Sequence, residues 1–163
     1  REAYASFGVK PRVGRSSVEA LARRCANGLP RIDLITDIYN SVSVKHLIPV
    51  GGENFHKYVG PPQLVIATGN ETFDTTAEGD AVIQNPEASE IVWMDEAGVT
   101  CRRWNWRQCT RTRLGHDTTT ALFILDGLGV DSSERTERAA TELTSLIAHR
   151  WKSATFESIL ITN

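Results

Sequence analysis

The sequence contains no apolar run that approaches the ~20 residues a helix needs to cross a bilayer, so it offers no candidate membrane span. A net charge of −2 excludes nucleic-acid binding by attraction to the whole molecule, and any RNA contact must come from a local patch. The three cysteines, Cys25, Cys101 and Cys109, are an odd number, which argues against a secreted disulfide framework. We therefore expect free thiols, a cytoplasmic location and no membrane partner.

Familiar catalytic signatures are also missing. The chain has no Gly-x-Ser-x-Gly nucleophile elbow and no P-loop. The spacing of Cys101, Cys109 and His116 matches no zinc template, and a fourth ligand is not evident. The cysteines have no local signature that would activate a thiol. We therefore expect no metal, no cofactor and no thiol nucleophile.

What the sequence does contain is ordinary for a globular protein. Its 163 residues, with 40% hydrophobic and 23% charged side chains, can bury a sizeable core. We expect residues 1–163 to form one domain of mixed α/β (α+β) class, because its helices and strands do not alternate as in a βαβ chain.

Three helices are predicted. A capping box at residues 16–19 starts the first, whose apolar stripe runs to Cys25 and which ends at Gly28. The second covers 32–45, where polar residues such as Ser43 interrupt an apolar segment and favour a face that lines something other than core. The third begins at a cap in 131–134, with an apolar face on Ala139, Leu143, Leu146 and Ile147.

Short apolar or alternating runs predict strands. Asp95 to Gly98 is typical of a hairpin turn between two of them, whereas the polar stretch 74–86 is predicted to be a loop. The predicted strands are 63–67, 90–94, 99–103, 121–125 and 159–161.

Residues 101–113 hold five of the 18 basic residues, interleaved with two tryptophans. Arginine beside flat aromatic rings suits single-stranded nucleic acid, because phosphates pair with the cations and bases stack on the rings. An edge strand with its tryptophans in the core and its arginines in solvent would give the same pattern. If the segment is extended, one face carries Arg103, Asn105 and Arg107, and the other carries Arg102, Trp104, Trp106 and Gln108.

A second polar cluster combines the helix residues Asp37, Tyr39 and Asn40 with the stretch 51–54, Gly-Gly-Glu-Asn. Two carboxylates, two amides and a flexible backbone could bind a small polar ligand. The alternative is an ordinary exposed Asp37 and a plain glycine turn.

The strings at 37–43, 48–54 and 98–108 resemble, in order, the stand-alone relatives of the B3/B4 domain, the editing domain of the phenylalanyl-tRNA synthetase β subunit. The resemblance runs from about residue 17 to 147. It implies a mixed sheet domain with flanking helices and a pocket between the two halves of the sequence. It also implies hydrolysis of tyrosine from the phenylalanine tRNA, or in some free-standing members of canavanine from the arginine tRNA.

The resemblance matches the family's helix asparagine to Asn40 and its post-helix proline to Pro49. Tyr39 and Gly51 stand where the synthetase domain has threonine and histidine, so those two roles do not carry over. The predicted site residues fall into three groups: catalytic Asn40, Gly51, Gly52 and Glu53; substrate-binding Asp37, Tyr39, Ser43, Trp104, Asn105 and Trp106; and tRNA-binding Arg102, Arg103, Arg107 and Arg111.

These residues together predict a trans-editing hydrolase that deacylates mischarged tRNA, with the acceptor end of the tRNA as partner and transient association with a synthetase. The carboxylates of Asp37 and Glu53 favour a guanidinium-like side chain, and hence canavanyl-tRNA(Arg), because a planar fork fits a carboxylate at two points. The alternatives are editing of tyrosyl-tRNA(Phe) and a non-catalytic module that binds tRNA or an amino acid.

Overall fold

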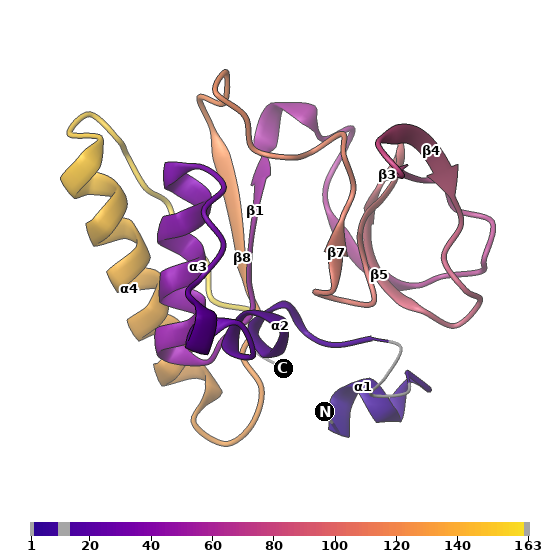
Figure 1. Ribbon diagram of the computed structural model, residues 1–163, viewed down its shortest axis with the longest axis horizontal. Helices are drawn as coiled ribbons and strands as arrows, with labels where there is room; N and C mark the ends of the chain where they lie inside the picture. The colour runs from indigo at the N-terminus through magenta and orange to yellow at the C-terminus, as the bar shows by residue number, and fades with distance from the viewer. Residues whose placement is uncertain (1, 10–13, 162–163) are drawn as a thin grey trace. The chain divides into compact units, whose positions relative to one another are not determined.

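The computed structural model describes residues 2–9 and 14–161 and has the mixed α+β class that was predicted. Contacts divide the chain into two compact units: unit 1 contains 1–17 and 52–123, and unit 2 contains 18–51 and 124–163. The helices of the described residues (Figure 1) are α1 (Glu2–Ser6), α2 (Ser17–Ala22), α3 (Leu34–His46), α4 (Ser132–Arg150) and the 3-10 turns η1 (Cys25–Asn27) and η2 (Phe55–Lys57). The strands are β1 (Val50–Asn54), β2 (Gln63–Ile66), β3 (Phe73–Ala77), β4 (Asp80–Gln84), β5 (Ile91–Asp95), β6 (Gly98–Arg102), β7 (Arg107–Gln108) and β8 (Ala121–Leu125).

Unit 1 is built on an antiparallel sheet of order β2-β5-β6-β7 together with the hairpin β3-β4. Phe73, Val92, Val99 and Cys109 are fully buried in its core, with Ala67 beside them. β2 lies at the edge of the sheet and alternates accordingly, because Val65 packs on the core while its neighbours are exposed. The predicted strands at 63–67, 90–94 and 99–103 are confirmed within one or two residues.

The hairpin turn predicted at 95–98 is confirmed, and its chemistry explains why the chain reverses there. The Asp95 carboxylate accepts hydrogen bonds from the amides of Ala97 (3.0 Å) and Gly98 (3.2 Å). Gly98 has a φ of 141°, and a Cβ atom there would lie 2.6 Å from the carbonyl oxygen of Thr72. This position therefore requires glycine.

The loop predicted at 74–86 is wrong, because β3 and β4 form a hairpin across most of it. Phe73 and Thr75 are buried while Asp74 and Thr76 are only half-buried, so the segment does alternate. Threonine supplies one of the buried positions, and the pattern therefore does not register as apolar.

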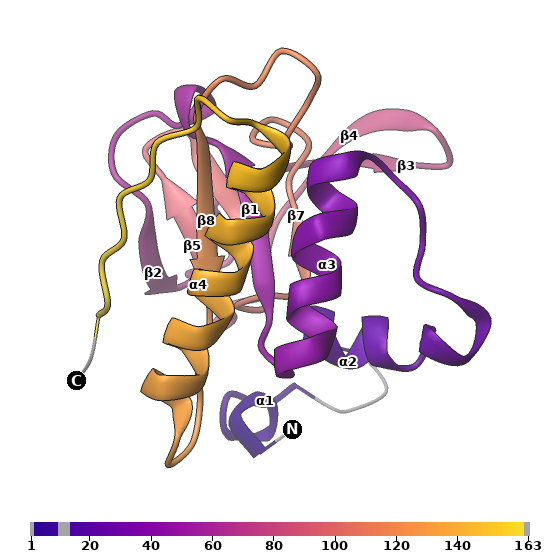
Figure 2. The ribbon, with the colours of Figure 1, turned by 90° about the vertical axis from the view of Figure 1, so that its left-hand side faces the viewer.

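Unit 2 contains α3 and α4, which pack side by side (Figures 1 and 2). Asp33 caps α3 by accepting a hydrogen bond from the Thr36 amide at 2.8 Å, and the helix ends at Leu47 in the left-handed region. Glu142 of α4 pairs with both Lys45 and His46 of α3 at 2.7 Å. Both predicted helices are confirmed, although Asp131 makes no side-chain cap bond and Leu146 is exposed.

Two local predictions in unit 2 are wrong. The first helix does not run from its capping box to Gly28; it stops at Ala22 and is followed by η1, which leaves Cys25 exposed. Only Leu21 of its predicted stripe is buried, so packing does not hold a longer helix together. The run 159–161 is not a strand in the described structure, and Ile159 and Ile161 are exposed. A β-branched sequence forms a strand only where another strand pairs with it.

Candidate functional site

Unit 1 contains a buried polar cluster around Glu53, a residue of β1 that is only 3% exposed. The Tyr58 hydroxyl donates to Glu53 Oε2. The Gln108 amide donates both to Glu53 Oε1 at 3.2 Å and to the Gly52 carbonyl oxygen at 2.7 Å. Gln108 therefore holds the carboxyl group and the adjoining backbone together. Gly52 accordingly lies in a strand, not in the flexible stretch predicted from the glycine pair.

Burial governs the electrostatics of this cluster. Desolvation raises the pKa of Glu53, and hydrogen bonds from Tyr58, Gln108 and Thr112 offset only part of the rise. Burial and the nearby Glu53 charge raise the pKa of Tyr58 far above its usual value, so its phenol remains a donor. A carboxylate with an elevated pKa is a stronger base than an ordinary one, and fixed donors hold its orientation.

The raised pKa of Glu53 has a testable consequence for stability. A carboxyl with a higher pKa in the folded than in the unfolded state makes the folded protein bind more protons. Stability should therefore fall as the pH rises from about 4.5, the ordinary value, through the folded pKa. Relative to Glu53→Gln, the wild type should lose about 1.4 kcal/mol for each pH unit that separates the folded pKa from the unfolded one.

Urea unfolding from pH 4.5 to 8 measures this difference. Glu157→Gln, at an exposed carboxyl in the C-terminal segment, is the matched control and should follow the wild type. Parallel curves for wild type and Glu53→Gln would mean that burial does not perturb this carboxyl group.

Unit 2 has its own polar residues on α3. Asn40 is 7% exposed, and within the described structure its side-chain amide makes no hydrogen bond to protein. The donors and acceptor of this amide are therefore free of competing protein bonds. Ser43 is fully buried and donates to the Ile48 carbonyl oxygen at 2.6 Å. Gly51 and Tyr39 are both half-buried.

Asp37, near the start of α3, already accepts two donors. The Ile32 amide lies 3.0 Å from Oδ1, and Arg31 Nε lies 2.6 Å from Oδ2. The bond from Ile32, followed by the Arg31 charge, lowers the pKa of Asp37. The Arg31 side chain is 87% exposed, so solvent screening keeps this ion pair weak. A second guanidinium could therefore displace it.

Residues 101–113, called here the Arg/Trp segment, do not form one extended strand, so the two faces predicted for them do not exist. β6 ends at Arg102, a turn covers 103–106, and β7 pairs back so that Arg102 lies opposite Arg107. Arg103 and Trp104 have φ values of 47° and 65°. This left-handed backbone conformation does not occur in a regular β-strand. Local sequence favoured a strand, but the hairpin pairing requires a reversal here.

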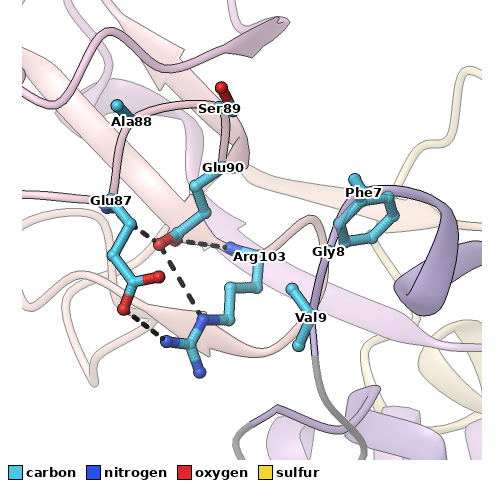
Figure 3. A pocket seen from close by; sticks show the side chains of 8 residues that line it. All are labelled: Phe7, Gly8, Val9, Glu87, Ala88, Ser89, Glu90 and Arg103. Atoms are coloured by element: carbon cyan, nitrogen blue, oxygen red, sulfur yellow. Dashed lines mark hydrogen bonds and ion pairs between the residues drawn. The ribbon is translucent and has the colours of Figure 1, made fainter.

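The turn directs its first two arginines inward. Arg102 makes two hydrogen bonds to Glu90, at 2.9 and 2.7 Å, and the Arg103 amide donates to the same carboxylate at 3.0 Å. Figure 3 shows the Arg103 guanidinium bonded to both Glu87 and Glu90, beside a pocket that Phe7 and Val9 also line. Burial alone would raise the pKa of Glu90, but Arg102 lowers it, so this carboxylate stays ionised.

The remaining residues of the segment also have protein partners. Arg111 makes a two-point ion pair with Asp95, at 2.9 and 2.8 Å, and Arg107 donates to the Thr76 carbonyl oxygen at 3.0 Å. The guanidinium of Arg103 lies 4.4 Å from the centre of the Trp106 ring. The buried Tyr4 of α1 stacks on Trp104 and donates to Asn105 Oδ1 at 2.7 Å. Within unit 1 these side chains therefore bond to other groups of the protein.

Sequence reasoning missed Tyr58, Thr112 and the role of Gln108. No local motif marks Tyr58 or Thr112, and Gln108 was only the last residue of a motif interpreted as RNA-binding. In the part of the chain that the structure describes, no group of three or more His, Cys, Asp or Glu side chains could hold a metal ion. None of the described helices is long and apolar enough to span a membrane.

The described residues have a mixed α+β fold, with a buried carboxyl–phenol–amide cluster in unit 1 and the Asn40 amide on α3 of unit 2. A model of the B3/4 domain matches residues 1–155, and the chain belongs to this family. The family is associated with phenylalanyl-tRNA synthetase, with editing and with tRNA binding. A search among curated proteins finds no significant match.

Proposed function

We propose that this protein is a trans-acting deacylase that hydrolyses the ester bond between a wrong amino acid and its tRNA. Membership of a family associated with editing is the observation that carries this proposal. An aminoacyl ester is already activated, so its hydrolysis needs a positioned water and stabilisation of the developing oxyanion. The chain's own polar residues can supply both functions without a covalent intermediate.

Asn40 is the proposed oxyanion donor. Its amide is nearly buried and unbonded, so it can donate to the ester oxygen without first breaking a protein hydrogen bond. Such a preorganised donor strengthens its interaction as charge develops in the transition state. The backbone amides of Gly51 and Gly52 are proposed to help hold the ester.

Glu53 is the proposed residue for orienting the attacking water. Its raised pKa makes it a stronger base than an ordinary carboxylate, and Tyr58 and Gln108 fix its orientation. For tRNA binding we retain Arg107, whose one hydrogen bond to a carbonyl leaves other N–H donors for a phosphate. The other three predicted tRNA-binding arginines would act by supporting the fold around them.

For the substrate side chain, we propose a guanidino-type group such as that of canavanine on the arginine tRNA. The pair between Asp37 and the exposed Arg31 supports this, because the Asp37 carboxylate already accepts a guanidinium. Canavanine carries an oxygen that lowers the basicity of its guanidino group. Because the Asp37 carboxylate alone would bind the more basic arginine at least as well, the rest of the pocket is proposed to disfavour the fully charged form and so to spare correctly attached arginine.

Deacylation of canavanyl-, arginyl- and tyrosyl-tRNA, measured side by side, tests both the proposed deacylase activity and the proposed substrate side chain. We expect canavanyl-tRNA to react fastest, Asp37→Asn to reduce its kcat/KM by roughly tenfold, and Arg31→Ala to lower its KM by freeing the carboxylate. Arg24→Ala, at an exposed arginine of the same unit, is the control and should change neither constant.

Faster release of tyrosine than of canavanine would replace the guanidino proposal with the tyrosyl-tRNA(Phe) alternative. Tight tRNA binding without turnover of any ester would instead identify a non-catalytic binding module.

A further inference from the structure

Unit 1 exposes a group of cationic and aromatic side chains outside the turn at 103–106. It comprises Phe55, His56 and Lys57 of η2 together with Arg113 and His116 of the loop after β7, and we call it the two-loop surface. All five side chains are exposed, and the Phe55 ring is 49% exposed. Sequence reasoning did not predict it, because the two segments are more than 50 residues apart in the chain.

Hydrogen bonds join the two loops into one ordered surface. The amide of Asn54 donates to the Thr112 carbonyl oxygen at 2.8 Å, and the amide of Phe55 donates to the Thr120 carbonyl oxygen at 3.0 Å. The Asn54 side chain accepts from the His56 amide and donates to Thr118 Oγ1. A surface that is ordered before binding loses little conformational entropy when a ligand arrives.

Arg111 connects this surface to the sheet. Its guanidinium is fixed on Asp95 and also donates to the Lys57 carbonyl oxygen at 2.6 Å. Asp95 neutralises Arg111, so Lys57 and Arg113 are the charges presented to solvent. Asp117 is the one acidic residue within 55–57 and 110–120. The two-loop surface thus presents two cations, Lys57 and Arg113, with the carboxylates of Asp74, which accepts from the Arg111 amide at 2.6 Å, and Asp117 beside it.

The surface combines the two kinds of group that single-stranded nucleic acid requires, exposed aromatic rings and cations. The Phe55 and His56 rings lie 6.2 Å apart at 69°, so the two rings present differently oriented faces. A base can stack on an exposed aromatic ring whatever its identity, while separate cations contact successive phosphates. The geometry points to the two-loop surface as the site that binds the single-stranded acceptor end of tRNA.

That assignment rests on the proposed function for the identity of the RNA. The position of the surface agrees with it, because β1 runs from Glu53 directly into η2. Phe55 therefore follows, by two residues, the carboxyl group proposed to orient water. RNA held at Phe55 would bring its terminal nucleotide towards that end of β1.

Binding of uncharged tRNA by the full chain, measured by fluorescence anisotropy from 50 to 200 mM salt, tests this inference. The probes are tRNA with its 3′ single-stranded end and the same tRNA with that end removed. We expect Phe55→Ala and Phe55→Leu each to weaken binding of the intact tRNA by roughly 5- to 150-fold, since either change removes the stacking ring. Neither variant should alter binding of the trimmed tRNA.

The double variant Lys57→Ala/Arg113→Ala should reduce the slope of log K against log[salt] by about 1.4, or about 0.7 for each phosphate that is no longer neutralised. Arg24→Ala/Lys152→Ala removes two exposed cations elsewhere and should leave the slope unchanged. Thermal unfolding confirms that each variant is folded.

Unchanged affinity and slope in the Phe55 and Lys57/Arg113 variants would refute RNA binding at the two-loop surface, even if the wild type hydrolyses mischarged tRNA. Failure of the wild type to bind intact tRNA would overturn it too. Tight binding that depends on Phe55, without any hydrolysis, would uphold the surface and refute the proposed deacylase.

Discussion

Replacing Glu90 with glutamine is expected to lower the free energy of unfolding by about 3–5 kcal/mol, the usual cost of removing one partner of a buried ion pair. The Glu90 side chain is 2% exposed and accepts two hydrogen bonds from Arg102 and one from the Arg103 amide. Glutamine has nearly the same shape, but it carries no charge and has only one acceptor oxygen. The guanidinium groups of Arg102 and Arg103 would then remain buried without the negative charge of Glu90.

Glu87→Gln is the matched control for this experiment. Glu87 also pairs with Arg103, at 3.4 Å, but its side chain is 76% exposed, and exposed pairs contribute about 0–1 kcal/mol. Urea denaturation at neutral pH should therefore separate the two variants by several kcal/mol. Equal losses of stability in both would show that burial does not determine the strength of these pairs.

The contribution of Glu90 also has a defined pH dependence. Its pKa in the folded state is below the ordinary 4.5, so its stabilisation is fully present above that value. The stabilisation disappears as the pH falls through the folded pKa. The Glu90→Gln variant should therefore lack this part of the wild-type protein's acid sensitivity.

Replacing Asn40 with alanine is expected to reduce kcat for deacylation by about 10²–10³-fold, the typical effect of removing an oxyanion donor. Because the Asn40 amide makes no protein hydrogen bond in the described structure, its removal leaves no buried partner unsatisfied. Stability should therefore change by much less than activity. KM should change little, since the donor acts mainly in the transition state.

Single-turnover hydrolysis gives the rate, measured on whichever of canavanyl-, arginyl- and tyrosyl-tRNA reacts fastest with the wild type. Thermal unfolding gives the stability. Ser41→Ala is the control, because Ser41 is the next residue on α3 but is exposed, and its hydroxyl donates to the Ile38 carbonyl oxygen. Full activity in Asn40→Ala, or an equal reduction in Ser41→Ala, would remove Asn40 from the mechanism.

Elements whose stability comes from local sequence were predictable. α3 and α4 have helical periodicity, and the Asp95–Gly98 turn contains the carboxylate and glycine that such a turn needs. The motif strings identified the B3/4 family, whose model matches residues 1–155. The β3-β4 hairpin was not predictable, because its buried positions include Thr75 and its composition is that of a loop.

The sequence by itself determined the fold class, most of the helices and strands, and the family, since these depend on neighbouring residues and on the order of the motifs. Only the tertiary structure decided what the polar side chains contact. Arg102 and Arg103 bond to a carboxylate 12 and 13 residues away, and Gln108 holds a carboxyl group 55 residues away. Burial and pKa depend on such distant partners, because desolvation and ion pairing act through space and not along the chain.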